Sequence, residues 1–85
     1  MYAQLERSGF VYNPQEIAAR IKSTAAMKDV SLKSLLTDCG LGINTVSKIA
    51  AGTDILTLNF VKIADYLNVS VDYLLGRTDI PEINR

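Results

Sequence analysis

The sequence predicts an all-α fold in which five short helices form one compact domain, and three observations lead to this expectation. Apolar residues recur at spacings of three and four, as they do on the buried face of a helix. Residues that start and stop helices bracket these apolar segments. No segment alternates apolar and polar residues as a half-buried strand would. We expect an N-terminal extension at residues 1–12, the helical domain at 13–79 and a C-terminal tail at 80–85.

The first helix is expected to begin after Asn13 and to end near Lys28. Asparagine is a favoured helix cap, and Pro14 suits the first helical position because the N–H that proline lacks would have no partner there. Ile17 and Ile21 lie four residues apart and begin an apolar stripe. This stripe predicts that one side of the helix is buried.

The second and third helices are expected at residues 32–39 and 43–51, with a short break between them. Ser31 is a suitable cap for the second helix. Gly40 can end this helix because glycine readily adopts the left-handed backbone conformation found at helix ends. Gly42 then stands where the third helix would be capped. Three residues, 40–42, would form the turn.

The fourth helix is expected to start at a Thr57 cap and to stop at Asn68, and the fifth to start at a Ser70 cap and to stop at Gly76. The expected core face of the fourth helix is a stripe with spacings of three, widened on one side by Phe60 and Ile63. The residues of this stripe are Leu58, Val61, Ala64 and Leu67.

The composition favours a binding protein over an enzyme. The chain has 85 residues, one cysteine and no histidine. It therefore lacks the commonest general base and cannot form an internal disulfide or a cysteine-rich zinc site. We expect no catalytic residues, no cofactor, no metal and no small-molecule ligand. We also expect a cytoplasmic protein with no membrane partner, because no apolar run approaches the roughly 20 residues of a membrane span. Cys39 is expected to be a small core residue.

The net charge of zero conceals a basic central segment. Residues 20–48 hold five basic and two acidic residues, which gives +3. The flanking segments 1–19 and 49–85 sum to −1 and −2. The positive charge thus coincides with the glycine break, and such an asymmetry indicates a negatively charged partner.

Two helices joined by a three- or four-residue turn containing glycine form a helix-turn-helix unit, whose second helix can enter the major groove of DNA. Here residues 40–42 would be the turn, and Leu41 is expected to fill the core between the helices. The groove is about 12 Å wide and admits one helix that protrudes and carries side chains able to hydrogen-bond base edges. The break therefore predicts a DNA-binding unit.

Two stretches of the sequence carry a resemblance to a known protein family. They are TVSKI at residues 45–49, followed by Gly52, and LTLNFVKIADYLNVSVDYLLGRTD at residues 56–79. Over residues 20–79 the chain resembles the phage repressor-like, Cro-type (Xre-type) helix-turn-helix regulators. The resemblance implies a five-helix lambda-repressor-like DNA-binding domain, in which residues 32–39 cross the DNA backbone and residues 43–51 are the recognition helix. Members generally bind palindromic double-stranded operators as homodimers, often as repressors of phage or host genes.

The resemblance also implies roles for individual residues. Base contacts are expected from Ile43, Asn44, Ser47 and Lys48. Phosphate contacts are expected from Ser31, Lys33, Thr45, Gly52 and Thr53. Each role has an ordinary alternative: Asn44 could cap a helix that starts later, Ile43 could lie in the core, and Lys48 could be a solvated surface charge.

Apolar residues beyond the capacity of so small a core suggest a dimer contact. These residues are Tyr66, Tyr73, Ile80 and Ile83, and the alternative is that the tail folds back over its own domain. The chain also departs from the family pattern at Leu32, where glutamine is frequent, at Gly42, where serine is usual, and at Ile43, where a polar residue is common. Together with the zero net charge, these departures motivate an alternative function, a protein-interaction module or antirepressor that keeps the fold without binding DNA.

Overall fold

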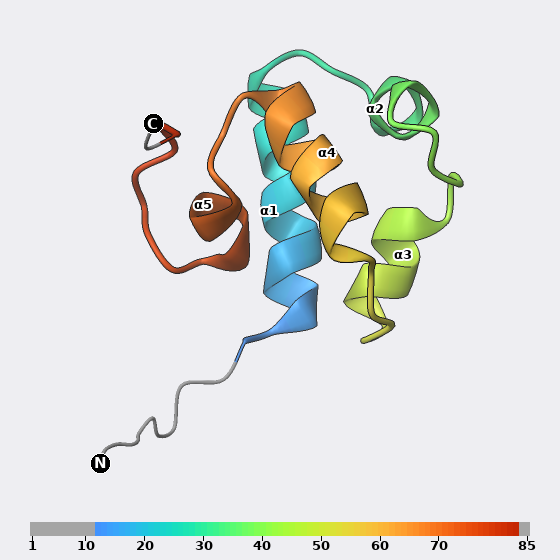
Figure 1. Ribbon diagram of the computed structural model, residues 1–85, viewed down its shortest axis with the longest axis horizontal. Coiled ribbons are helices and arrows are strands. Elements are labelled where there is room, and N and C mark those ends of the chain that lie inside the picture. The colour runs from blue at the N-terminus through green and yellow to red at the C-terminus, as the bar shows by residue number, and fades with distance from the viewer. Residues whose placement is uncertain (1–11, 84–85) are drawn as a thin grey trace.

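The structure is a computed structural model that describes residues 12–83. Nearly all of the expected N-terminal extension, and the last two residues of the expected tail, therefore lie outside the described residues. Within 12–83 the chain is all-helical and compact, which confirms the predicted all-α class. The elements are α1 (Pro14–Met27), α2 (Leu32–Asp38), α3 (Thr45–Ala50), α4 (Thr57–Leu67) and α5 (Val71–Leu75) (Figure 1).

Helix α1 is the central element of the domain. In Figure 1, α2 and α3 lie on one side of α1 and α5 lies on the other. Contacts join α1 to α2, α3 and α5, and α4 to α2 and α5. Helix α3 is therefore held mainly by the long helix α1, and it lies at the edge of the domain.

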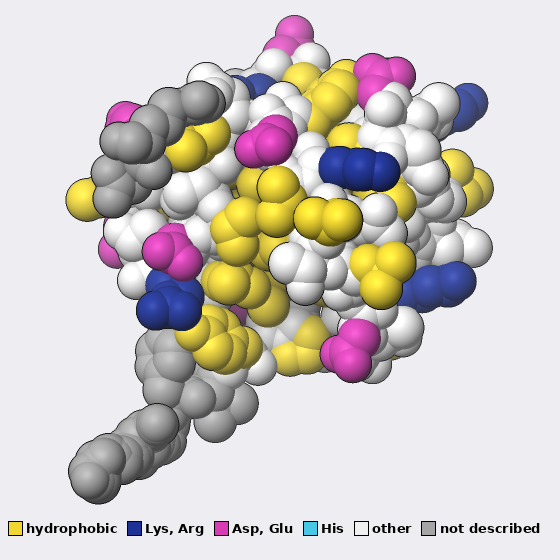
Figure 2. All heavy atoms as spheres, in the orientation of Figure 1, with side chains coloured by type: hydrophobic (Ala, Val, Ile, Leu, Met, Phe, Trp, Pro, Cys, Tyr) yellow, Lys and Arg dark blue, Asp and Glu magenta, His cyan; other side chains and the backbone are white. Residues whose placement is uncertain are grey.

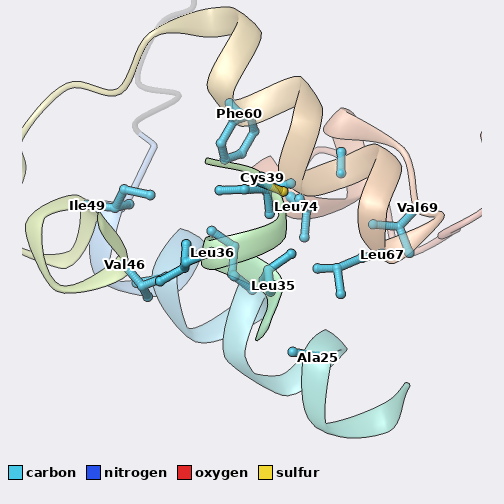
Figure 3. Packing of buried hydrophobic residues seen from close by; sticks show 14 residues of the cluster. Ala25, Leu35, Leu36, Cys39, Val46, Ile49, Phe60, Leu67, Val69 and Leu74 are labelled. Atoms are coloured by element: carbon cyan, nitrogen blue, oxygen red, sulfur yellow. The ribbon is translucent and has the colours of Figure 1, made fainter. Parts of the chain in front are cut away.

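The core draws apolar side chains from all five helices (Figure 3). One expectation about it was wrong, because Leu58 is 74% exposed. The buried stripe of α4 runs instead through Phe60, Ile63, Ala64 and Leu67, and Val61 is half-buried. Two residues correspond to about 200° around a helix. Leu58 therefore points away from the side on which Phe60 enters the core.

Three of the five predicted helix caps are confirmed. The side chain of Asn13 accepts hydrogen bonds from the backbone N–H groups of Gln15 and Glu16, at 2.9 and 3.3 Å. Ser31 and Ser70 accept in the same way at the starts of α2 and α5. The predicted cap at Thr57 was wrong, because the last extended residue before α4 is Leu56 and Thr57 is already helical.

A left-handed residue follows each helix and reverses the chain. The predicted stops at Gly40, Asn68 and Gly76 are confirmed, and Asp29 and Gly52 play the same part after α1 and α3. In each case two backbone N–H groups beyond the helix donate back to carbonyls of its last turn, which satisfies groups that a helix end leaves unpaired. These closed ends keep the connections between the helices short.

Thr24 is a buried polar residue of α1 that provides a test of the core. Its side chain is fully buried, and its hydroxyl finds no hydrogen-bond partner among residues 12–83. A buried, unpaired hydroxyl costs roughly 1–3 kcal/mol. We expect Thr24→Val to raise the free energy of unfolding by about 1 kcal/mol and the melting temperature by about 5 °C, measured by thermal circular dichroism. Thr24→Ser keeps the hydroxyl and loses a methyl group, so it should destabilise; a valine variant no more stable than the original would contradict the expectation.

Candidate nucleic-acid interface

The connection between α2 and α3 is longer than the sequence predicted. It comprises residues 39–44 rather than three or four residues, because α2 ends at Asp38 and α3 begins only at Thr45. Gly40, at φ +73°, turns the chain, and its N–H donates to the Thr37 carbonyl at 3.0 Å. The next N–H, that of Leu41, donates to Leu36 at 2.8 Å. Leu41 then lies half-buried against the core, as expected.

The late start of α3 corrects two predictions, the helix boundary at residue 43 and the cap at Gly42. The carbonyl of Gly42 accepts hydrogen bonds from the N–H and the hydroxyl of Thr45, at 3.1 and 2.6 Å, and these hold residues 42–45 in a turn. Asn44 occupies the cap position, and its carbonyl accepts the first helical hydrogen bond, from the N–H of Lys48. The Asn44 side chain makes no capping hydrogen bond. Its exposed amide is thus not used to start the helix.

The four residues expected to contact bases lie on the exposed side of α3 or in the turn directly before it. Val46 and Ile49 point into the core, where they meet side chains of other helices (Figure 3). At helical spacing their burial directs the opposite side of α3 to the surface. That side bears the exposed Ser47 and Lys48, and the exposed Ile43 and Asn44 directly precede the helix. Ile43 is 71% exposed, which excludes the alternative that it belongs to the core.

The end of α3 is fixed by Gly52 at φ +91°. The N–H of Gly52 donates to Ile49 and that of Thr53 to Lys48, both at 2.9 Å. These two N–H groups are therefore engaged within the chain. Of the phosphate contacts expected at this loop, the exposed hydroxyl of Thr53 remains the group best able to donate one.

The other residues expected to contact phosphate differ in their availability. Ser31 and Lys33 are exposed at the start of α2. The Ser31 hydroxyl oxygen accepts from the Ser34 N–H at 3.1 Å, which leaves its own proton to donate. Thr45 is half-buried and gives its single hydroxyl proton to Gly42. Thr45 would have to break that bond to contact a phosphate.

The lysines of α2 and α3 form no ion pair with other residues of the described part of the chain. Among residues 12–83 the ion pairs use Arg20 and Arg77, whereas Lys33 and Lys48 form none there. Figure 2 shows Lys and Arg side chains at the edge where α2 and α3 lie, and hydrophobic side chains gathered in the middle of the same view. Exposed lysines without an acidic partner, placed beside a helix at the surface, favour the binding of a polyanion.

A shallow groove of about 210 Å³ separates α3 from the start of α4. Thr45 and Lys48 border it on the α3 side, and Leu56 and Asn59 border it on the other. Thr53 and Asp54 form the connecting loop. The residues before α4 are thus direct neighbours of the outward face of α3.

The four residues expected at a dimer contact are spread over α4, α5 and the tail. Tyr66 donates its hydroxyl to Asp38 at 2.6 Å, and Tyr73 is half-buried with the Arg20 guanidinium 4.9 Å from its ring centre. Ile80 is exposed and Ile83 is half-buried. Their role in a dimer stays a prediction.

The described part of the tail folds back on its own domain. Pro81 accepts a hydrogen bond from the Ser70 N–H at 2.9 Å. Arg20 reaches from α1 to the Tyr73 carbonyl at 3.2 Å and to the Asp79 carboxylate at 3.3 Å. The tail therefore folds back over its own domain as far as residue 83, which was the alternative to a dimer contact.

The single cysteine is a core residue. Cys39 is buried, and its thiol donates to the Lys62 carbonyl at 3.6 Å. Burial raises the pKa of this thiol, the charge of Asp38 adds to the rise, and Lys62 opposes it. Since the thiolate is the reactive form, Cys39 is suited to packing rather than to chemistry.

The hydrogen bond between Tyr66 and Asp38 predicts a pH effect. Donation to the Asp38 carboxylate raises the pKa of the Tyr66 phenol, so ionisation must break the bond. A pKa that is higher in the folded than in the unfolded state gives stabilisation that is present below about pH 10 and is lost as pH rises through the folded pKa. In an alkaline absorbance titration, the difference between the protein and Tyr66→Phe should have its midpoint above pH 10. A midpoint at or below the ordinary tyrosine value would contradict this expectation, and Asp38→Asn should lower it.

Comparison with known proteins adds no relative, because no family model, no curated protein and no solved structure matches the chain. Among residues 12–83, no helix is both long and apolar enough to cross a membrane.

Proposed function

We propose that the protein is a sequence-specific DNA-binding transcriptional regulator, a repressor that binds a palindromic operator as a homodimer. In this proposal α2 and α3 form the helix-turn-helix unit of a lambda-repressor-like, Cro-type domain. The observation that carries it is the exposed side of α3, with Ser47 and Lys48 on the helix and Asn44 at its cap position, while Val46 and Ile49 anchor the helix in the core.

The chemistry of this face matches the edges of base pairs. An asparagine amide can both donate to and accept from adenine, and a lysine can donate to the two acceptors of guanine. Asn44 and Lys48 are four residues apart and so lie on one side of the helix, with Ser47 between them. Ile43 offers an apolar surface for a thymine methyl group. The face therefore presents hydrogen-bonding and apolar groups that distinguish base pairs in the major groove.

The backbone contacts follow from the exposed groups around α3. Ser31 caps α2 and Lys33 lies in its first turn, whereas Thr53 lies in the loop after α3. Neutralising phosphates releases bound cations from DNA, so affinity falls steeply as salt increases. We place the phosphate contacts at these three residues, of which Lys33 is the only charged one.

Selection of bound sequences from a random pool of duplex DNA tests this function. At low salt, the proposed regulator should enrich a palindrome whose half-sites are centred about 34 Å apart, one turn of the double helix. The same protein should retain less of the enriched DNA as salt increases. Absence of any enriched sequence at low salt would contradict the proposal.

The second candidate is a protein-interaction module or antirepressor that uses the same fold. The observation that favours it is apolar exposure near α3, at Ile43, Leu56 and Leu58, in a chain with no net charge. Such exposed apolar residues suit a protein partner. The same selection distinguishes the two candidates, because a module of this kind would enrich no DNA sequence.

A further inference from the structure

Two exposed leucines adjoin the start of α4. Leu56 is 75% exposed and Leu58 is 74% exposed. A single exposed leucine is ordinary on a protein surface, but two at one helix start form a local apolar patch. Neither serves the core, since Leu56 occupies the cap position and Leu58 lies on the side of α4 away from Phe60. We call Leu56 and Leu58 the leucine patch.

We infer that the leucine patch is where two copies of this chain meet, around a two-fold axis, with Asp54 of each copy facing Lys62 of the other. This inference rests on the proposed function and deepens it, because an operator-binding homodimer needs such a contact. It differs from the contact predicted from the sequence, which used the tyrosines of α4 and α5 and the tail.

Charge complementarity identifies a second copy as the occupant. Asp54 precedes the patch, and Lys62 follows Leu58 by one helical turn on the same outward side of α4. Both side chains are exposed, and neither forms an ion pair within residues 12–83. In a two-fold interface each surface meets its own reversed copy. Because Asp54 and Lys62 stand four residues before and after Leu58, a two-fold axis at Leu58 would set the acid of one copy against the base of the other, twice per dimer.

The position of the patch suits the proposed DNA geometry. Recognition helices in successive major grooves are about 34 Å apart, so each lies about 17 Å from the two-fold axis. Leu56 borders the same shallow groove as Lys48 of α3, so an axis through the patch keeps α3 close to it.

The patch is small, and this predicts a weak dimer in the absence of DNA. Stable interfaces bury about 800 Å² on each partner, which is more than two leucine side chains supply. Association should therefore be a reversible equilibrium in the micromolar range or weaker, strengthened when both copies occupy one operator. Sedimentation equilibrium without DNA measures it directly.

The first experiment compares the full chain with L56S/L58S in sedimentation equilibrium at concentrations up to about 1 mM. The double variant should weaken dimerisation at least about tenfold. Met27→Ser is the matched control, because Met27 is an equally exposed apolar residue (70%) at the end of α1, and it should leave dimerisation unchanged. A monomeric original protein, or an unchanged dissociation constant in L56S/L58S, would overturn the inference. So would a loss of dimer confined to Ile80→Ser, which would place the contact at the tail.

The second experiment reverses the charges. Asp54→Lys and Lys62→Asp should each weaken dimerisation, since each sets two like charges against one another. The combined variant should regain the original dissociation constant, because the pairs are restored with exchanged signs. Failure of this rescue would overturn the stated pairing. All four residues are exposed, so circular dichroism should show the same folded domain in every variant.

The DNA selection keeps this inference separable from the proposed function. If the leucine variants lose dimerisation but the original protein enriches no DNA, the dimer contact is supported and the DNA-binding function is contradicted. If a palindrome is enriched but the leucine variants dimerise normally, the DNA-binding function is supported and the dimer contact at the leucine patch is contradicted.

Discussion

Replacing Asn44, Ser47 and Lys48 together by alanine is expected to reduce affinity for the selected operator about 1,000-fold while the domain stays folded. A well-formed hydrogen-bonded pairing of a side chain with a base is worth roughly 1–3 kcal/mol, and about 1.4 kcal/mol corresponds to tenfold in affinity. Three side chains that each contribute near the low end of that range together account for this factor. All three side chains are exposed, so their removal opens no cavity. Fluorescence anisotropy at one fixed salt concentration measures the decrease in affinity.

Helix α1 offers a matched control for this variant. Gln15, Lys22 and Ser23 are exposed and repeat the amide, the cation and the hydroxyl of the α3 face. Their replacement by alanine changes the net charge by the same amount and should alter operator affinity only a few-fold. Equal decreases in affinity in the two triple variants would show that charge alone governs binding, and full binding by the α3 variant would exclude α3 as the reading element.

Truncating Ile63 to alanine is expected to cost about 3 kcal/mol of stability and to lower the melting temperature by roughly 15 °C. Ile63 is fully buried in α4, where it belongs to the core shared by all five helices. Its truncation removes apolar packing and leaves a cavity that the surrounding side chains cannot fill. In so small a domain this is a large share of the total stability. Thermal circular dichroism measures the shift.

Leu58→Ala is the control on the same helix. Leu58 is mostly exposed, so the same kind of truncation should change stability by no more than about 0.5 kcal/mol at concentrations where the chain is monomeric. A similar destabilisation in both variants would contradict the burial pattern of α4.

Local chemistry made most helix limits predictable from the sequence. Asn13, Ser31 and Ser70 cap helices because their side chains bond to nearby N–H groups, and Gly40 and Gly76 end helices because they adopt left-handed backbone. These effects involve neighbours within a few residues. The predicted start of α3 was wrong because residues 42–45 form a turn in which the N–H and the hydroxyl of Thr45 donate to the Gly42 carbonyl, and residue types alone do not reveal that turn.

The α4 stripe shows where apolar spacing is ambiguous. Val61, Ala64 and Leu67 are compatible with a stripe that begins at Leu58, but the helix turns its Phe60 side to the core. Too many apolar residues lie on this helix for spacing to select one face, and packing against α2 and α5 makes the selection. The exposed leucine patch therefore could not be found from the sequence, whereas α3, with fewer apolar residues, showed its outward face clearly.

The brevity of α3 limits how much sequence one copy can specify. Six residues rise about 9 Å, which matches the length of about three base pairs. Three positions distinguish only about 64 sequences, and two copies about 4,000, far fewer than the million or more competing sites of a genome. A regulator built on this helix would therefore depend on several adjacent operators, or on the local flexibility of the DNA between half-sites, to choose its genes.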